Sequence, residues 1–233
     1  MFKPMQKINY TLLRKPYRRT ISIEVTPKNK VVVKASKSYP DKLINQFIIK
    51  KSRWIQKQFD FNKKVRKPPL VRKYISGENY LFLGDYYQLS LAEGKSGIFV
   101  DDQKIKFFAS KKYLARKKYI QNKLKAWYKE QAYKKILERV SFYEKVLRVN
   151  ISDLRIKSFK RSWGNCSTKK RVSFSPYLIM VPITVIDYVV VHELLHIIVP
   201  NHSTKFWNFL KKIIPDYKQR KKWLVVHENQ FCI

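Results

Sequence analysis

Three of the four histidines in this chain stand close together, in the stretch VVVHELLHIIVPNHSTKFW (residues 189–207). His192 and His196 are four residues apart, so on an α-helix both imidazoles lie on one face and can bind the same ion. Glu193 follows His192 directly, which places it poorly as a ligand but well for contact with a water bound to that ion. The HExxH spacing therefore predicts a metal-activated water with Glu193 as its general base.

Zinc is the metal that we expect, and a catalytic zinc has three protein ligands and one position left for water. Pro200 cannot continue a helix and Asn201 tolerates a left-handed turn, so the chain is expected to turn after Val199. His202, six residues after His196, is then the preferred third ligand. Two downstream carboxylates are the alternatives for this role: Asp216 and Glu228.

A buried helix that carries histidines only for packing is the structural alternative. The residues around HELLH are indeed apolar: Val190, Val191, Leu194, Leu195 and Ile198. An unpaired Glu193 inside such a helix would be costly, however, whereas a metal site accounts for it. The sequence therefore favours a metal site over packing alone.

Hydrophobic periodicity predicts the elements that must position this site. Alternating and β-branched runs near the N-terminus indicate short strands, and a helical spacing of apolar residues follows them. The strands are expected at 7–13, 20–26 and 31–34, with a turn at 27–30 and a helix from about Asp41 to Asn62. The charged, proline-bearing stretch KKVRKPPLVRK (residues 63–73) is interpreted as a linker or exposed loop.

The second half of the chain is predicted to be mostly helical after a β-hairpin region. Turn signals at Gly84-Asp85, Glu93-Gly94 and Asp101-Asp102 break residues 77–110 into hairpins. The expected elements after it are a long helix at 111–147, strands at 154–159 and 171–174 around a loop at 162–170, a helix from Pro182, and a helix capped by Ser203. We expect an N-terminal strand, helix and hairpin region at residues 1–110 and a catalytic region at residues 111–233.

Composition bounds the class of protein. A hydrophobic fraction of 45% with 15 Tyr, 14 Phe and 5 Trp fits a folded chain rather than a disordered basic tail. The only cysteines, Cys166 and Cys232, form no CxxC pair, which argues against a zinc ribbon and fits a reducing compartment. The N-terminus lacks an apolar signal core, and the longest uncharged run (172–186) is too short to span a bilayer. We therefore expect a cytoplasmic protein.

The net charge of +35 is the second prominent property of the chain. It favours a polyanionic partner such as DNA, RNA or an anionic membrane surface. A biased genome is the alternative explanation, since Lys, Ile, Asn, Tyr and Phe are all frequent here, but it does not explain the scarcity of acids. The basic stretches KKVRKPPLVRK and KQRKKW, interleaved with aromatic residues, are typical of nucleic-acid contact.

The C-terminal motifs resemble those of the YgjP-like metallopeptidase family, which is related to the SprT-like and WLM peptidases and to the small gluzincin fold. The matching motifs are a WGSCS-type loop at 163–167, DYVVVHELLH, NHSTKFW and the PDYKQRKKWL stretch. The N-terminal part is also similar, with Trp54-Ile55 on a helix and a G-x-x-Y-x-x-LG-x-x-Y pattern from Gly77 to Tyr87. The resemblance spans about residues 15–226.

The resemblance implies a zincin-like α+β fold, with an active-site helix preceded by a β-rich N-terminal region. It implies metal binding by His192, His196 and His202 and catalysis by Glu193. Asn165 stands where the family's loop has serine, and Ser175 where asparagine is common; both lie outside the metal set.

The loop residues Trp163, Gly164, Asn165 and Cys166 are candidates for a substrate cleft, as an edge strand to which a peptide can add. A packed hairpin turn is the alternative. Cys166 is a weaker candidate for a fourth ligand. His227 is a candidate transition-state donor, with a plain surface histidine as the alternative. Packing is the expected role of Tyr188, and Tyr217 fits either role.

The sequence thus predicts a zinc-dependent metallopeptidase that acts on polypeptides. The alternative is a nucleic-acid-associated protein, whose protease acts only on DNA-bound proteins or whose metal site is structural. The chain gives no indication of the oligomeric state.

Overall fold

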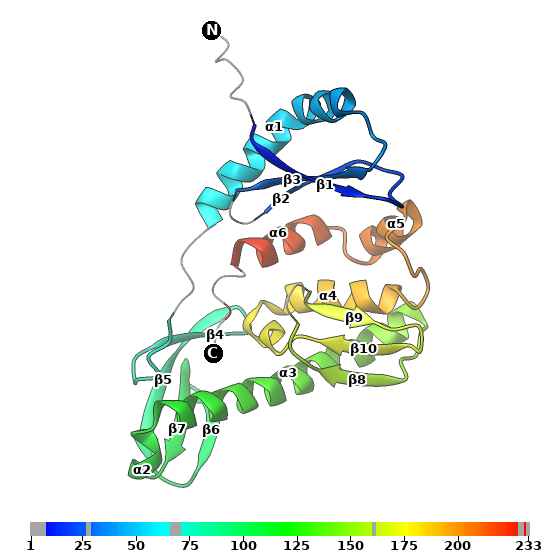
Figure 1. The fold of residues 1–233 in the computed structure, drawn as a ribbon. Helices are drawn as coiled ribbons and strands as arrows, with labels where there is room; N and C mark the ends of the chain where they lie inside the picture. Colours follow the sequence, from blue (N-terminus) through cyan, green and yellow to red (C-terminus); the bar gives the residue numbers. More distant parts are fainter. Residues whose placement is uncertain (1–7, 27–28, 66–70, 160–161, 228–230, 232–233) are drawn as a thin grey trace. The chain divides into compact units, whose positions relative to one another are not determined.

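The computed structural model describes residues 8–26, 29–65, 71–159, 162–227 and 231. The chain forms two compact units, residues 1–68 and 69–233, with α+β structure in each (Figure 1). The division between the units falls before the hairpin region; a division into functional regions at residue 110 stays a prediction. Apolar residues of the hairpin strands pack with the following long helix in one core, which places them in the second unit.

The first unit is a three-stranded sheet covered by one helix. Its elements are β1 (Tyr10–Lys15), β2 (Ser22–Val25), β3 (Val31–Ser36) and α1 (Asp41–Val65). The central strand β3 pairs in parallel with β1 and antiparallel with β2. Alternate residues of β3 point to the same face of the sheet and bury against α1. The buried residues are Val31, Val33, Ala35, Ile44, Ile48 and Ile55.

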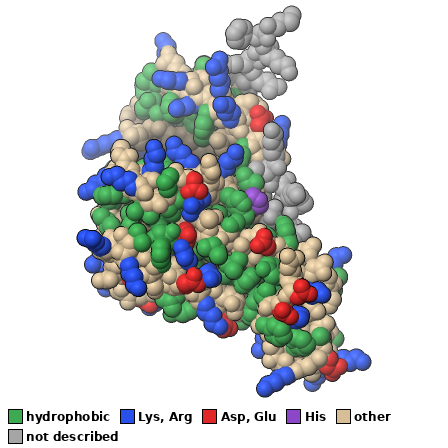
Figure 2. Space-filling model, turned by 180° about the vertical axis from the view of Figure 1, so that it is seen from behind, with side chains coloured by type: hydrophobic (Ala, Val, Ile, Leu, Met, Phe, Trp, Pro, Cys, Tyr) green, Lys and Arg blue, Asp and Glu red, His purple; other side chains and the backbone are tan. Residues whose placement is uncertain are grey.

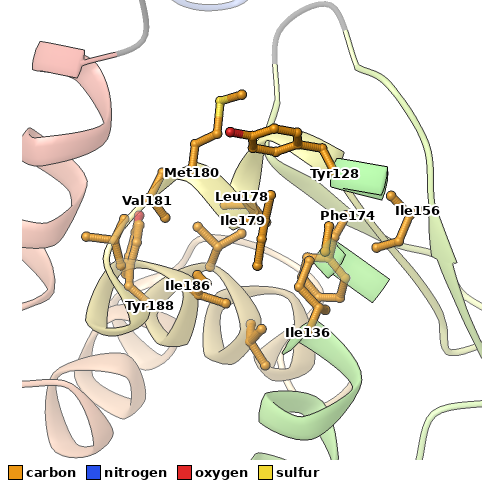
Figure 3. Close-up of a cluster of buried hydrophobic side chains, with 14 of the residues drawn as sticks. Tyr128, Ile136, Ile156, Phe174, Leu178, Ile179, Met180, Val181, Ile186 and Tyr188 are labelled. Atoms are coloured by element: carbon orange, nitrogen blue, oxygen red, sulfur yellow. The ribbon is translucent and has the colours of Figure 1, made fainter. Parts of the chain in front are cut away.

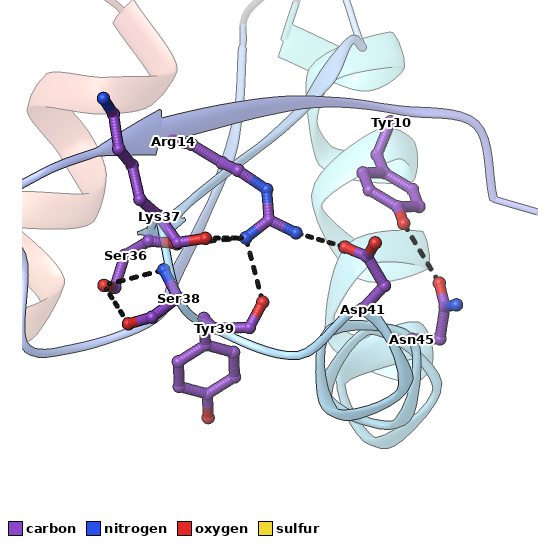
Figure 4. Close-up of polar contacts among 8 residues, drawn as sticks. All are labelled: Tyr10, Arg14, Ser36, Lys37, Ser38, Tyr39, Asp41 and Asn45. Atoms are coloured by element: carbon purple, nitrogen blue, oxygen red, sulfur yellow. Dashed lines mark hydrogen bonds and ion pairs between the residues drawn. The ribbon is translucent and has the colours of Figure 1, made fainter.

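Arg14 of β1 fixes the connection between β3 and α1 (Figure 4). Its Nη1 donates hydrogen bonds to the carbonyls of Ser36, Lys37 and Tyr39 at 3.2, 2.7 and 2.9 Å. Its Nη2 pairs with Asp41, whose negative charge in the first turn also suits the positive end of the helix dipole. One planar guanidinium therefore holds three carbonyls and the start of the helix.

The second unit begins with a four-stranded sheet of β4 (Asn79–Phe82), β5 (Asp85–Glu93), β6 (Gly97–Asp101) and β7 (Lys104–Ala109). The strand order is β4-β5-β7-β6. The β4–β5 and β6–β7 hairpins form at the predicted turns. The hairpin expected at Glu93-Gly94 is absent from these strands, because β7 lies between β5 and β6 and pairs in parallel with β5.

The long helical segment is divided at Ala115-Arg116 into α2 (Lys111–Leu114) and α3 (Lys117–Leu147). In Figure 1, α3 extends from the β4–β7 sheet past the second sheet of this unit. Its buried residues recur at helical spacing: Ile120, Leu124, Trp127, Tyr128, Ala132, Ile136, Val140 and Tyr143. Tyr128 donates a hydrogen bond to the carbonyl of Leu81 at 2.9 Å, which joins α3 to β4.

The remaining strands form a small sheet beside the helix that carries the histidines. β10 (Arg171–Phe174) pairs in parallel with β8 (Asp153–Ile156) and antiparallel with β9 (Gly164–Cys166). The loop predicted at 162–170 therefore contains a third strand, and β9 is at the edge of this sheet. After it come the 3-10 helix η1 (Pro176–Met180), α4 (Ile183–Leu195), α5 (Thr204–Ile213) and α6 (Tyr217–His227).

Helix α4 is buried on nearly all sides, as expected for a helix that is apolar all round. Figure 3 shows its residues Ile186 and Tyr188 among side chains of η1, β10 and α3. Its one buried acid besides the HELLH glutamate is Asp187, which accepts two hydrogen bonds from Arg139 of α3 at 2.6 and 3.1 Å. This ion pair joins α4 to α3. No helix in the described ranges is long and apolar enough to cross a membrane.

Candidate metal centre

Three imidazoles converge at the C-terminal end of α4. His192 lies in its last turn, His196 is its C-cap residue, and His202 lies just before α5. One nitrogen of each ring lies within 4.8 Å of the others, and the Nε2 atoms of His192 and His202 are 2.9 Å apart. A residue on the helix, a residue at its end and a residue after the turn thus face one point.

The turn that brings the third histidine back begins earlier than the sequence predicted. Helix α4 ends at Leu195 rather than continuing to Val199, and residues 196–199 form a tight turn. The backbone N–H groups of Ile198 and Val199 both donate to the Leu195 carbonyl, at 3.0 and 2.8 Å. His196 keeps right-handed helical angles, so its i, i+4 relation to His192 survives the end of the helix.

Neighbouring groups orient two of the imidazoles. His196 Nδ1 lies 3.3 Å from the Val199 carbonyl, which can only accept, so the ring donates there and its Nε2 keeps a lone pair. The Trp207 indole N–H donates to the carbonyl of His202 at 3.1 Å, and the two rings stack at 5.5 Å. His192 Nδ1 is buried without a hydrogen-bond partner in the described structure, and its ring packs 4.9 Å from that of Phe206.

The surroundings favour neutral imidazoles. Burial, followed by the charges of His196, His202 and Lys221, lowers the pKa of His192 to about 3. Burial also lowers the pKa of His196, although its hydrogen bond to Val199 opposes the change. Because a metal binds the unprotonated nitrogen, these shifts keep the ligand form available well below neutral pH.

Glu193 lies beside the cluster and is only 7% exposed. Burial raises the pKa of its carboxyl to about 7, and a hydrogen bond from the backbone of Cys166 partly opposes this. Gly164 of β9 packs directly against it, since a Cβ there would lie 2.7 Å from Glu193 Cγ and 2.9 Å from Oε1. The edge strand therefore forms one wall around the carboxylate.

The donor set fits a metal that prefers nitrogen ligands, because three imidazoles converge and no carboxylate or thiolate joins them. Across the described ranges this is the one group of histidine, cysteine and acidic residues spaced for an ion. Asp216 pairs with Arg220 at 2.9 Å, and Cys166 Sγ contacts the Ser167 carbonyl at 3.6 Å. Glu228 lies outside the described residues.

A cavity of about 410 Å³ opens beside the histidines. Trp163 and Tyr188 line it, whereas the exposed Asn165 and the ring of His227, stacked on Trp223 at 4.0 Å, do not. Its full lining is Ser162, Trp163, Tyr188, Val189, His192, Glu193, His202, Trp207, Lys221, Leu224 and Val225.

The contribution of α6 to this cavity was missed from the sequence. One face of α6 carries Tyr217, Lys221, Leu224 and Val225, because these residues recur at the three- or four-residue spacing of a helix. Tyr217 itself is buried and stacks on Trp207 at 5.6 Å. The helical spacing of Lys221, Leu224 and Val225 is the sequence signal from which their shared face could have been predicted.

The fold and the histidine cluster together define a class, the metal-dependent peptidases. The chain belongs to the YgjP-like family, whose metallopeptidase domain matches residues 19–227, close to the span of the resemblance. Among solved structures, the metallopeptidase zymogen abylysin of Pyrococcus abyssi is 21% identical over 38% of this chain and 90% of its own, with a TM-score of 0.36. No curated protein matches the sequence.

Proposed function

We propose that the protein hydrolyses peptide bonds with a zinc ion bound by His192, His196 and His202, and with Glu193 as general base. The observation that carries this proposal is the convergence of three imidazoles beside the buried carboxylate of Glu193. Peptidase chemistry itself follows from the family; zinc and the individual residues are the proposal. Other transition metals also bind imidazole-rich sites, so metal analysis is part of the test.

A bound zinc ion would supply a Lewis acid and a water of lowered pKa. Glu193 would take the proton from the attacking water and deliver it to the leaving amine. A carboxyl with a pKa of about 7 suits both transfers, because neither its acid nor its base form is strongly favoured at neutral pH. Gly164 and the backbone of Cys166 hold this carboxyl in place.

The open edge of β9 is the proposed binding site for the substrate backbone. Among the described strands, β9 pairs with β10 on one side only, so an extended polypeptide can add along the other side. Trp163, at its start, lines the cavity, while its carbonyl accepts a hydrogen bond from Ser175 N–H at 2.8 Å. That hydrogen bond also fits the alternative, in which the segment is chiefly a packed turn.

The test pairs elemental analysis with two variants. Glu193→Gln removes the base but keeps the ligands, so we expect bound metal and loss of casein or peptide hydrolysis. His196→Ala removes a ligand, so we expect loss of both metal and hydrolysis. Full hydrolysis by Glu193→Gln would rule out this mechanism, and a protein with bound metal that cleaves no peptide would indicate a structural site.

A second candidate function is nucleic-acid association, which the surface of α1 favours. Lys42, Lys50, Arg53 and Lys57 are exposed and follow one another at near-helical spacing on one side of this helix. Trp54, beside Arg53, is 42% exposed and offers a ring on which a base can stack. No described acid lies within ion-pair distance of these four cations. Figure 2 shows Lys and Arg side chains scattered over the face it presents, where they are more frequent than Asp and Glu.

This candidate is tested by salt-dependent binding to single-stranded and duplex DNA. Lys50, Arg53 and Lys57 changed together to Gln should weaken binding and reduce its salt dependence, since each lost phosphate contact removes about one counterion. The matched control changes Lys118, Lys125 and Lys129, exposed on α3, to Gln. Equal loss in both variants would contradict a site on α1. Peptide hydrolysis that requires DNA would favour a protease for DNA-bound proteins.

A further inference from the structure

The cavity beside the histidines has a wall that the hydrolytic step does not use. This wall is the face of α6 that carries Lys221, Leu224 and Val225. Leu224 is 4% exposed and forms part of the floor, while Val225 is 40% exposed at the rim. A wall next to the reacting groups contacts whatever side chain the substrate places there.

The chemistry of this cavity is mostly apolar with one positive charge. Apart from the metal-binding histidines and Glu193, its lining is aromatic and aliphatic, except for Ser162 and Lys221. An apolar wall gives little discrimination between side chains of similar size, whereas a single charged group in it gives much more. Lys221 is therefore the residue on which selectivity depends.

Lys221 is held close to the metal-binding residues. Its Nζ lies 5.4 Å from the centre of the Trp207 ring, which itself stacks on His202. The aromatic ring thus places an ammonium group at the edge of the reaction site.

The ammonium of Lys221 has no acidic partner among the residues that the structure describes. The adjacent Arg220, by contrast, pairs with Asp216 and donates to the Thr184 carbonyl at 2.7 Å. A cation that lines an apolar cavity without a counterion favours an anionic occupant.

We propose that this cavity binds the substrate residue next to the scissile bond and that Lys221 selects for a carboxylate at that residue. The proposal rests on the peptidase function proposed above. The carboxylate is either an Asp or Glu side chain or the free C-terminus of the substrate. Its hydrocarbon portion packs against Leu224 and Tyr188, and its oxygens accept hydrogen bonds from the Lys221 ammonium.

The alternative role of Lys221 is packing, in which its ammonium only covers the Trp207 ring. The two roles differ in substrate preference. Packing alone predicts no difference between a glutamate and a glutamine at the cleavage site. Selection predicts a preference for glutamate that disappears when the charge is removed.

The test maps cleavage sites in a peptide library by mass spectrometry. The wild type should favour acidic residues, or free over amidated C-termini, by about tenfold. Lys221→Ala should lose this preference, and Lys221→Glu should shift it toward Lys and Arg. Lys222→Ala is the control, because Lys222 is exposed on α6 outside the cavity lining and should leave the preference intact. The same preference in Lys221→Ala as in wild type would overturn the proposal.

A binding measurement separates this proposal from the peptidase function. The probes are N-acetylglutamate amide, N-acetylglutamine amide and an N-acetylated amino acid with a free α-carboxylate. Their binding is followed through the indole signals of Trp163 and Trp207 in ¹⁵N-labelled protein. Shifts caused by a carboxylate probe, absent with the neutral amide and in Lys221→Ala, support the subsite even if no peptide is cleaved. Cleavage without such shifts would overturn the subsite while the peptidase function stands.

Discussion

At the scale of single residues, the site depends on the missing side chain of Gly164 as well as on the side chains that are present. Gly164 leaves the space that the Glu193 side chain fills, and any Cβ would approach Glu193 Cγ to 2.7 Å. The three nearest atoms to such a Cβ all belong to Glu193. A change at Gly164 therefore tests the placement of this carboxylate.

We expect Gly164→Ala to lower kcat/KM for peptide hydrolysis by at least about tenfold, because an added methyl forces the general base from its position. Metal content should remain that of the wild type. Gly97→Ala is the control, since the nearest atom to a Cβ there is the Lys95 carbonyl oxygen at 3.9 Å. Unchanged kinetics in Gly164→Ala would show that Glu193 does not need this contact.

At the scale of elements, α4 is positioned by packing and by one buried ion pair. Arg139 of α3 donates hydrogen bonds to both carboxylate oxygens of Asp187 of α4. The side chains of Arg139 and Asp187 are 19% and 11% exposed. This contact raises the pKa of Arg139 through its hydrogen bond to Asp187. Removal of one partner leaves a buried charge without compensation, which costs more than the pair contributes.

Arg139→Met should lower the free energy of unfolding in urea by about 3 kcal/mol. The double variant Arg139→Met with Asp187→Leu should regain part of this loss, because no charge remains buried. Lys134→Ala, which breaks an exposed pair with Glu130, should change stability by less than about 0.5 kcal/mol. A double variant less stable than either single variant would contradict the account.

At the scale of the whole molecule, the three proposed metal ligands all lie in the second of two compact units. A metal that binds only the folded form stabilises that form, by about 4 kcal/mol at a thousand times the dissociation constant. The first unit has its own core and contains none of these three histidines.

Calorimetry of the full chain should therefore show two unfolding transitions. Zinc should raise the midpoint temperature of one of them. A chelator should reverse the shift, and His196→Ala should show no shift because it lacks a ligand. The transition that zinc leaves unchanged belongs to the unit with α1. A single transition whose midpoint temperature zinc raises would mean that the two units unfold as one.

Local patterns predicted most of the elements, because helix periodicity and turn residues act over a few positions. The strands of the first unit, α1 and most of the long helix expected at 111–147 follow from such patterns. The parallel pairing of β5 with β7 could not be predicted, since it depends on how β6 folds back rather than on a local signal. The end of α4 at Leu195 was also missed, because the turn forms before Pro200 blocks the helix.

The candidate site also contains residues that local sequence patterns predict and contacts that they do not. Spacing alone pointed to His192, His196 and His202, which lie within eleven consecutive residues. The closeness of Gly164 to Glu193 and of Lys221 to Trp207 depends on tertiary packing, for which the sequence gives no spacing rule. The structure supplied both contacts.

The short separation of the ligands has a consequence for how the protein folds. The outermost pair, His192 and His202, is only ten positions apart, so bringing the two together costs little loop-closure entropy. Glu193 and its neighbour Gly164 are 29 positions apart along the chain, which makes their contact the more expensive one to form. We therefore expect the three histidines to come together before β9 docks beside Glu193, so that the proposed metal site forms before the proposed catalytic site.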